Sequence, residues 1–349
     1  MTVTVADQAR HQIIAGCAFN RVFTRRKHLR YGNHVGLVET ATELFEQIVQ
    51  PAIAVRLVHG EGDLLPGVVV DVYGAVAVLR LDGQAIERFR GALVATLAQM
   101  LPELGVETLL ERSGRGDTRR VQALWGALPD GLVEVREHGM RMPVDLIAGQ
   151  KTGLFLDHRD ARLRVRSLAS GARVVNLFGY TGGFSMAAGL GGAAHVDTVD
   201  VASGAIALAR EGWARNGLDA SAHDAHTVDV EKFLNAAKQQ GTSWELVIAD
   251  PPSFAPNEAA KRGALKAYRA LHTACLSRVT DGGLYLGASC SSHVHREDFD
   301  ATIREAAHAA KVSVQVLERS GAGFDRPVPV GFPEGAYLKS TLCRVLRLR

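Results

Sequence analysis

The chain has 349 residues, of which 47% are hydrophobic and 22% are charged, and its formal net charge is +3. This length suits two folded domains with a short extension, and the composition excludes wholesale disorder. No apolar run approaches the roughly 18 residues that span a bilayer, and residues 1–10 lack a secretory signal, so we expect a cytoplasmic protein.

The N-terminal part of the chain predicts an extension followed by a small α+β domain. Residues 1–50 are too few for an independent core, so we expect an N-terminal extension there. Short apolar runs separated by turns predict an α+β domain over residues 51–147. Its strands are expected at residues 56–58, 68–71, 75–81, 108–111, 132–137 and 140–145, with one helix over residues 85–101.

A Gly-rich stretch of this domain carries several arginines, namely Arg112, Arg115, Arg119 and Arg120. A solvated loop and a patch that contacts nucleic acid phosphates are both open interpretations. The net charge is only mildly basic and does not decide between them.

The remaining residues, 148–349, predict an α/β domain because β-branched runs alternate with helical patterns. Strands are expected at residues 173–178, 195–201, 222–225, 244–250, 284–290, 313–319 and 338–347. Helices are expected at residues 183–190, 204–216, 228–240, 260–279 and 296–310. A Gly- and Pro-rich loop without helical pattern separates the last two strands, which predicts an antiparallel pair. The sequence thus predicts a Rossmann-like, seven-stranded sheet whose last strand is antiparallel.

A glycine-containing turn lies where the first strand of this domain ends and its helix begins, the position at which open α/β sheets bind ligands. It lacks the G-x-G-x-x-G pattern that admits a pyrophosphate, so the predicted ligand is not a dinucleotide. An ordinary strand–helix turn is the alternative. The predicted ligand contacts are Asn176, Phe178, Tyr180, Thr181, Gly182 and Gly183.

Acidic residues follow two neighbouring strands. Asp200 lies about 20 residues after the turn, where a carboxylate accepts hydrogen bonds from ribose hydroxyls, and Val201 lies beside it. Asp224 follows the expected third strand, where it would accept from an adenine amino group while Ala225 donates through its backbone. A helix N-cap or a surface acid is the other interpretation of each.

The segment Asp250-Pro251-Pro252-Ser253-Phe254 follows the fourth strand. Two prolines remove two backbone donors and stiffen the chain, which fixes carbonyl oxygens as acceptors. We predict that Asp250 and Pro251 lie at the cofactor, and that Pro252 and Phe254 lie at the substrate. A rigid turn is the alternative.

Five segments together resemble the bacterial and archaeal 23S ribosomal RNA cytosine-5 methyltransferases of the methyltransferase I type. They are residues 149–159, 176–183, 216–218, 250–254 and 289–291, and residues 333–339 are similar to a further signature of the family. The resemblance covers about residues 55–349 and implies a class I methyltransferase fold, S-adenosylmethionine as cofactor and RNA as partner. It also implies that Lys151, Thr152 and Phe155 lie over the cofactor. Family members usually carry an N-terminal PUA domain, for which 50 residues do not suffice.

The chemistry of the resembled family needs a covalent partner, because carbon 5 of cytosine is a poor nucleophile. Thiolate addition at carbon 6 makes carbon 5 reactive, and Cys290 is the cysteine expected at the catalytic edge of the sheet. Asp250 would bond the cytosine at N3 and its amino group. Ser289 and Ser291, with Arg112, Arg115 and Arg119, are the other predicted substrate contacts.

The remaining cysteines, Cys17, Cys275 and Cys343, have no pair spacing typical of a metal site or disulfide framework, so no metal is expected. We expect Cys275 and Cys343 to be buried packing residues. A homodimer is left open.

Three other functions remain open. They are a guanine-nitrogen methyltransferase that uses residues 250–254 without a covalent step, a small-molecule methyltransferase, and a non-catalytic cofactor-binding RNA module.

Overall fold

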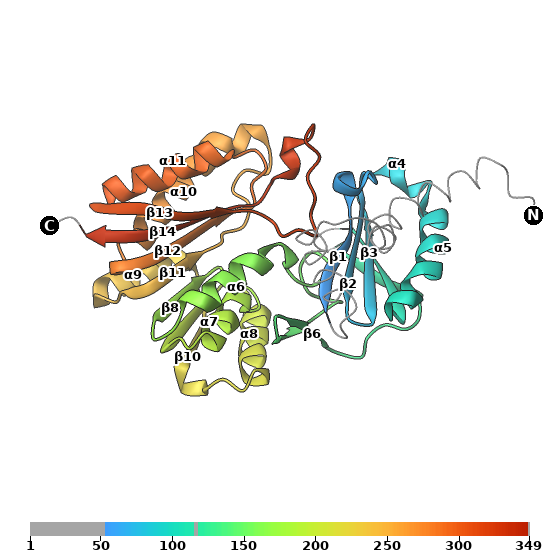
Figure 1. Ribbon diagram of the computed structural model, residues 1–349, viewed down its shortest axis with the longest axis horizontal. Coiled ribbons are helices and arrows are strands. Elements are labelled where there is room, and N and C mark those ends of the chain that lie inside the picture. Colours follow the sequence, from blue (N-terminus) through green and yellow to red (C-terminus); the bar gives the residue numbers. More distant parts are fainter. Residues whose placement is uncertain (1–52, 115–117, 348–349) are drawn as a thin grey trace, which may run out of the picture. The chain divides into compact units, whose positions relative to one another are not determined.

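The computed structural model describes residues 53–114 and 118–347 (Figure 1), which form two compact units. Unit 1 contains residues 53–137, 143–156 and 324–331, and unit 2 contains residues 138–142, 157–323 and 332–347. The predicted extension over residues 1–50 lies outside the described residues, as do Cys17 and Arg115. The division into domains at residues 147 and 148 remains a prediction, and the compact unit 1 also includes residues 148–156 and 324–331.

Unit 1 is built on a five-stranded sheet in the order β1-β2-β3-β4-β5. β3 and β4 are parallel, and all other neighbouring strands are antiparallel. Parallel neighbours need a crossover connection, and the one between β3 and β4 contains the longest described helix of the unit, residues 90–100. Leu93 and Leu97 of this helix pack with Val70 and Leu79 of the sheet. The elements are β1 (Ala54–His59), η2 (Gly60–Asp63), β2 (Val68–Tyr73), β3 (Val76–Leu81), α4 (Gln84–Glu87), α5 (Arg90–Met100), η3 (Leu101–Leu104), β4 (Thr108–Ser113) and β5 (Arg120–Trp125).

Two predictions for this region were wrong. The single helix expected over residues 85–101 is divided into α4 and α5 by a turn, in which the Phe89 amide donates to the Ile86 carbonyl. Strand β5 was not predicted, because it is an edge strand whose side chains are mostly exposed or half-buried and lack an apolar alternation. Two strands that were predicted, β6 (Val133–Glu137) and β7 (Met140–Val144), form a separate two-stranded sheet.

Unit 2 contains a seven-stranded sheet in the order β10-β9-β8-β11-β12-β14-β13. β14 is antiparallel to both of its neighbours, whereas β10, β9, β8, β11 and β12 are parallel, which confirms the predicted α/β class with a reversed last strand. The strands are β8 (Arg173–Leu177), β9 (His195–Asp200), β10 (His223–Thr227), β11 (Trp244–Ala249), β12 (Val279–Ser289), β13 (Val312–Ser320) and β14 (Lys339–Arg347).

Helices cover both faces of this sheet. Residues of α6, α7 and α8 share one apolar cluster with the sheet, and residues of α9, α10 and α11 share another on the opposite face. The helices are η5 (Leu156–His158), α6 (Arg159–Leu168), α7 (Gly183–Leu190), α8 (Ser203–Arg215), η6 (Ala220–Ala222), α9 (Val230–Gln240), η7 (Glu258–Ala260), α10 (Lys261–Leu276), α11 (Arg296–Ala309) and η8 (Pro333–Gly335). None of the helices in the described ranges has the length and apolar character needed to cross a bilayer.

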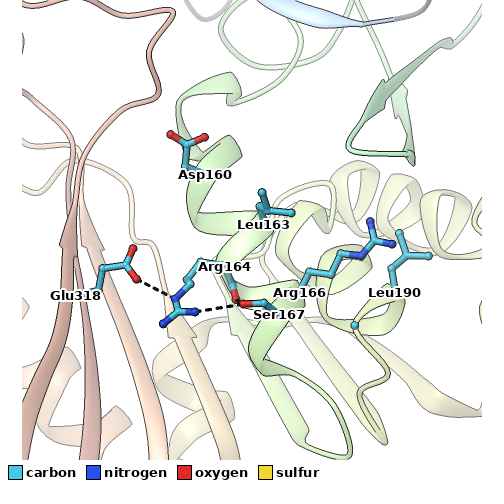
Figure 2. A pocket seen from close by; sticks show the side chains of 8 residues that line it. Asp160, Leu163, Arg164, Arg166, Ser167, Leu190 and Glu318 are labelled. Atoms are coloured by element: carbon cyan, nitrogen blue, oxygen red, sulfur yellow. Dashed lines mark hydrogen bonds and ion pairs between the residues drawn. The ribbon is translucent and has the colours of Figure 1, made fainter. Parts of the chain in front are cut away.

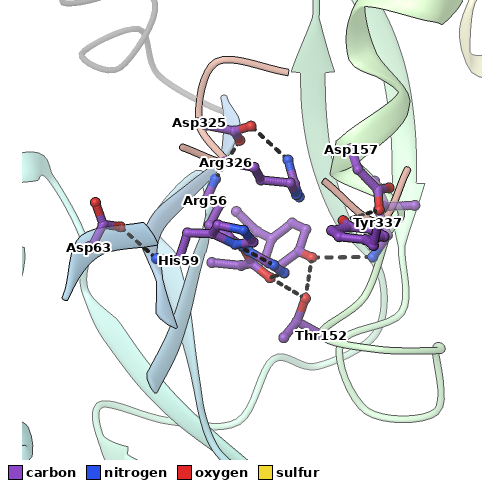
Figure 3. A network of polar contacts seen from close by, with 11 residues as sticks. Arg56, His59, Asp63, Thr152, Asp157, Asp325, Arg326 and Tyr337 are labelled. Carbon is purple, nitrogen blue, oxygen red and sulfur yellow. Dashed lines mark hydrogen bonds and ion pairs between the residues drawn. The ribbon is translucent and has the colours of Figure 1, made fainter. Parts of the chain in front are cut away.

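A buried ionic network in unit 1 is centred on Asp71, whose side chain is 0% exposed. Figure 3 shows this network with Arg56 and Thr152 labelled. Nε and Nη2 of Arg56 donate to its two carboxylate oxygens at 2.8 and 2.9 Å, and Thr152 Oγ1 donates to Oδ2. The Tyr73 hydroxyl bonds Thr152 Oγ1 at 2.9 Å. Burial would raise the pKa of Asp71, but the charge and hydrogen bonds of Arg56 hold it below the ordinary value. The network therefore fixes the segment around Thr152 to β1 and β2.

We predict that Asp71→Ala lowers the free energy of unfolding by about 3–5 kcal/mol, because Arg56 then loses the carboxylate that accepts from its Nε and Nη2 in a largely buried network. The matched control is Asp82→Ala, which breaks the exposed pair between Arg80 and Asp82 and should change that free energy by about 1 kcal/mol or less. Urea denaturation followed by tryptophan fluorescence measures both. Equal effects of the two substitutions would contradict the proposed importance of the buried pair.

Candidate functional site

The candidate site of unit 2 lies where the parallel strands end. In an open α/β sheet the carboxyl ends of parallel strands share one edge, and ligands bind there. At this edge residues 178–182 follow β8, Asp200 is the last residue of β9, Asp250 follows β11 and Cys290 follows β12. The strand order therefore brings together residues that are far apart in the sequence.

The loop after β8 has an uncommon backbone. Phe178 and Tyr180 have φ angles of 57° and 46°, which residues with a side chain rarely adopt. A Cβ atom on Gly179 would lie 2.7 Å from Thr198 Cγ2, so only glycine fits there. Such strain is concentrated at functional loops, which supports this loop as a binding element.

Asp200 is fixed beside this loop by two backbone amides. Its Oδ2 accepts from the Tyr180 amide and its Oδ1 from the Ala202 amide, both at 2.9 Å. Each carboxylate oxygen keeps a lone pair for a ligand hydroxyl. The next residue, Val201, is 67% exposed, which is high for an apolar side chain. The edge thus offers an oriented acceptor next to an apolar contact, as a ribose and its base require.

Two other predicted contacts in this segment are buried. Thr181 is almost fully buried, and Asn176 is 1% exposed. Asn176 Nδ2 donates to Ser185 Oγ, which in turn bonds Thr198 Oγ1 at 2.6 Å. The side chain of Asn176 therefore holds β8 against α7, and its contact with a ligand remains a prediction.

The placement of Asp224 after its strand was wrong. β10 continues to Thr227, so Asp224 and Ala225 lie within the strand, and Asp224 pairs in register with Asp197. The Asp224 carboxylate lies 3.3 Å from His195 Nε2. Ligand atoms of His195, Asp197 and Asp224 lie within 4.8 Å of one another, a spacing that could hold a metal ion.

Asp229 lies beyond the end of β10, where Asp224 was expected to lie. The Val228 amide donates to the Asp200 carbonyl at 3.0 Å, so the chain leaves the sheet beside Asp200. Asp229 follows and caps α9 by accepting from the Lys232 amide. The sequence signal that could have found it is the Asp at the start of a helical pattern.

Asp250 is paired with a histidine that the sequence did not mark as functional. His158 Nε2 lies 3.0 Å from Asp250 Oδ2, and the two side chains are 4% and 21% exposed. Beyond Asp250, Pro251 is buried and Pro252 is exposed. Phe254 is half-buried with its ring centroid 4.8 Å from that of Tyr268. A carboxylate held on one side by His158 can offer its other oxygen to a ligand.

The residues on either side of Cys290 are fully buried. Ser289 and Ser291 are each 0% exposed, and the Tyr268 hydroxyl bonds their Oγ atoms at 2.8 and 3.0 Å. Their predicted contact with substrate is therefore corrected: they fix the backbone around Cys290. Burial raises the pKa of Tyr268, and the neighbouring Cys290 and Asp250 raise it further, so the phenol stays protonated. Tyr268 was missed because its helical pattern indicates only a buried position.

The three cysteines in the described residues differ in environment. Cys290 is partly exposed, whereas Cys275 and Cys343 are buried, which confirms the expectation for those two. Burial raises the pKa of Cys343 to about 12 and that of Cys275 higher still, so neither forms a thiolate near neutral pH. Among the cysteines that the structure describes, Cys290 is the one whose exposure suits a nucleophile.

The segment 333–339 is anchored to the segment that follows residue 156 within unit 2. The Tyr337 hydroxyl donates to Asp157 Oδ2 at 2.6 Å. Two of the sequence segments singled out above therefore meet in space, although 180 positions separate them.

The predicted cofactor residues of unit 1 lie in one loop. Lys151 has a φ angle of 47°, and its Nζ lies 4.3 Å from the Phe155 ring centroid. Thr152 is 2% exposed because it belongs to the Asp71 network. The part that these three residues take in cofactor binding remains a prediction.

The predicted arginine patch of unit 1 is only partly accessible. Arg112 is 3% exposed and donates from Nη2 to the Gly149 carbonyl, so its predicted contact with nucleic acid is corrected to a structural role. Arg119 is exposed, although its Nη1 donates to the carbonyls of Ala148 and Gly149. Arg115 is outside the described residues.

A shallow hollow of about 620 Å³ lies elsewhere in unit 2 (Figure 2). It is lined by α6, by the C-terminal end of α7 and by Glu318 of β13, and Arg164 pairs with Glu318 at 2.9 Å. Because it contains no residue of the carboxyl edge, we do not assign it to the candidate site.

Proteins with similar sequences are methyltransferases. Residues 84–325 match the model of the S-adenosylmethionine-dependent methyltransferase family. The ribosomal RNA large subunit methyltransferase I of Shigella boydii is 36% identical over 294 residues, which are 83% of this chain and 74% of that protein. The protein of the same name from Escherichia coli is 35% identical over the same shares.

Solved structures agree on the fold. A SAM-dependent methyltransferase from Streptococcus mutans superposes with a TM-score of 0.80 and 23% identity, covering 99% of this chain and 83% of that one. The tRNA m1G37 methyltransferase of M. jannaschii superposes with a TM-score of 0.54 and 18% identity, covering 89% and 78%.

We predict that Tyr268→Phe lowers the free energy of unfolding by about 1–3 kcal/mol, because the buried Ser289 and Ser291 hydroxyls lose a partner. The control on the same helix is Thr273→Ala, which removes an exposed hydroxyl that donates to the Arg269 carbonyl. It should change the free energy of unfolding by no more than about 0.5 kcal/mol. Thermal unfolding by calorimetry compares them. A Tyr268→Phe protein as stable as wild type would refute the bracing role of the phenol.

Proposed function

Since the chain belongs to the S-adenosylmethionine-dependent methyltransferase family, we propose that it forms 5-methylcytosine in 23S ribosomal RNA. The RNA class is supported by relatives named ribosomal RNA large subunit methyltransferase I, of whose length the chain covers about three quarters. The base and the covalent mechanism are supported by the side chains at the carboxyl edge.

The cofactor half of the proposal rests on the edge of β8 and β9. The residues fit a nucleoside because Asp200 is an oriented acceptor, Val201 is an exposed apolar side chain and the loop before Gly182 lets backbone approach the ligand. Asp200 would accept from the ribose hydroxyls. Asp229, at the end of the neighbouring strand, would take the adenine amino group in place of Asp224. When bound, the cofactor supplies an electrophilic methyl group.

The substrate half rests on Cys290 and Asp250. The Cys290 thiolate gives an electron pair to carbon 6 of cytosine, and carbon 5 then takes the methyl group as the methyl–sulfur bond of the cofactor breaks. Loss of the carbon-5 proton to a base and cleavage of the carbon 6–sulfur bond return the thiolate. Asp250, held by His158, would hydrogen-bond the ring edge and stabilise charge during addition.

The observation that carries the proposal is the position of Cys290. It follows β12, the neighbour of the strand that precedes Asp250, and Ala249 pairs in register with Gly287. The two residues therefore leave adjacent strands at the same edge. Contact of unit 1 with the RNA backbone is part of the proposal, with the exposed Arg119 and Arg120 as candidates from the arginine patch.

We predict that Asp200→Ala weakens S-adenosylmethionine binding by about 1–3 kcal/mol, the cost of leaving polar partners unpaired. Isothermal calorimetry measures the affinity. The control is Asp219→Ala, which removes an exposed carboxylate that accepts from Ser221 and should leave affinity unchanged. An unchanged affinity in folded Asp200→Ala removes the ribose assignment.

The covalent mechanism predicts that RNA with 5-fluorocytosine at the target position traps the enzyme. Fluorine cannot leave as the proton does, so elimination is blocked and an adduct stable on a denaturing gel should form only when cofactor is present. Cys290→Ala should abolish both the adduct and methyl transfer while leaving cofactor affinity near wild type.

Cys275→Ala is the matched control, because it removes a buried thiol and should affect stability but not the adduct. If Cys290→Ala still methylates RNA at a comparable rate, the covalent mechanism is wrong. Nitrogen methylation of guanine supported by Asp250 and its two prolines then takes its place.

A further inference from the structure

Lys339 is a buried lysine in the segment 333–339, to which the proposed mechanism gives no role. Its side chain is only 4% exposed, although lysines are almost never buried without a partner. It is the first residue of β14, the reversed strand of unit 2. Because β14 runs opposite to β12, its first residue lies at the edge where β12 ends.

The contacts of Lys339 place its ammonium group at the backbone that flanks Cys290. Lys339 pairs in register with Ser289, the residue before the cysteine. Its Nζ donates at 2.7 Å to the carbonyl oxygen of Ser291, the residue after the cysteine. The lysine side chain therefore extends along the peptide that carries the thiol, and Cys290 lies between its two points of attachment.

The charges around this pair come from several elements. Arg296 of α11 lies near Lys339, and its Nη1 donates to the Ser340 carbonyl at 2.8 Å. Tyr268 of α10 lies near both Cys290 and Asp250, whose charges raise the pKa of its phenol. Burial lowers the pKa of Lys339 to about 8, Arg296 also lowers it, and Cys290 raises it. The lysine is therefore mainly protonated at neutral pH, and its charge is coupled to that of the cysteine.

A cation beside a cysteine favours the thiolate. With an ordinary pKa near 8.5, only a few per cent of a thiol is ionised at pH 7, and each unit by which the pKa is lowered multiplies that fraction by roughly ten. A nucleophile that must add to carbon 6 of a pyrimidine needs this fraction to be large.

We propose that Lys339 is a positioning residue that holds Cys290 as a thiolate through its ammonium group and fixes the thiol's backbone through Ser291. This inference rests on the proposed function of Cys290 as nucleophile. The lysine neither touches the base nor forms a bond in the reaction. It sets the ionised fraction of the sulfur, whose electron pair then forms the bond to carbon 6.

The test measures the ionisation of Cys290 directly. The rate of alkylation by iodoacetamide is followed between pH 5 and pH 10, and the peptide that contains Cys290 is quantified by mass spectrometry. In the wild type the midpoint should lie below about 8.5, the ordinary thiol value. Lys339→Met should move the midpoint upward by about one pH unit, so that alkylation at pH 7 slows roughly tenfold. Lys339→Arg, which keeps the charge, should retain a low midpoint.

Lys266→Met is the matched control, because Lys266 is exposed on α10 and should leave the midpoint unchanged. Cofactor affinity and thermal unfolding check that each variant is folded. If Lys339→Met does not fold, the wild-type midpoint decides, and a value at or above that of an ordinary thiol overturns the proposal. An unchanged midpoint in folded Lys339→Met also overturns it.

A second measurement separates this inference from the proposed function. For methyl transfer, the acidic limb of the pH profile should move to higher pH in Lys339→Met by the same amount as the alkylation midpoint. If Cys290→Ala still methylates RNA, the nucleophile assignment fails, whereas the alkylation midpoints continue to report on the coupling between Lys339 and Cys290.

Discussion

The parallel alignment of β8, β9, β10, β11 and β12 is the constraint on which the candidate site depends. Each strand delivers the residue that follows it to the same edge, so Asp200, Asp250 and Cys290 meet there without any need for proximity in sequence. Helices pack on both faces and bury the sheet. The chemistry of the site is therefore a property of strand order as much as of residue type.

Around this edge the structure holds the reactive groups through a second set of residues. His158 contacts Asp250, Tyr268 bonds the serines beside Cys290, and backbone amides fix Asp200. Catalytic geometry is held best by side chains whose own conformations are fixed by packing and hydrogen bonds. The burial of these supporting groups explains why several residues predicted to touch ligands are instead part of the scaffold.

What the sequence predicted well is local. The strands, most helices and the turn at Gly182 follow from apolar periodicity and glycine placement, which neighbouring residues determine. The reversed β14 followed from the missing helix before it. The predictions that failed depend on partners distant in sequence. Arg112 was taken as exposed because its burial against the Gly149 carbonyl arises only on folding, and β5 has no pattern of its own because only β4 pairs with it.

The end of β10 was also mispredicted because it depends on residues of a neighbouring strand. In β10, Asp224 contacts His195 and His226 contacts Asp197 of the neighbouring β9. Because the strand is mostly polar, no apolar run marks where it ends. The strand was predicted to end at residue 225 but ends at Thr227, so the acid that lies beyond it is Asp229 and not Asp224. Assigning contacts at a strand end requires the strand's register, which a single sequence does not contain.

β14 lies between β12 and β13 in the sheet, and this position affects how the loop before β14 can vary. β14 is hydrogen-bonded along its length to β12 on one side and to β13 on the other, so two ladders fix its register independently of the connection that leads into it. A slip by one residue would turn every side chain of the strand to the opposite face. A change of length in the largely exposed residues 328–332 need not therefore shift the register of β14, whereas the same change at Asp325 or Arg326 would disturb side chains that are buried in unit 1.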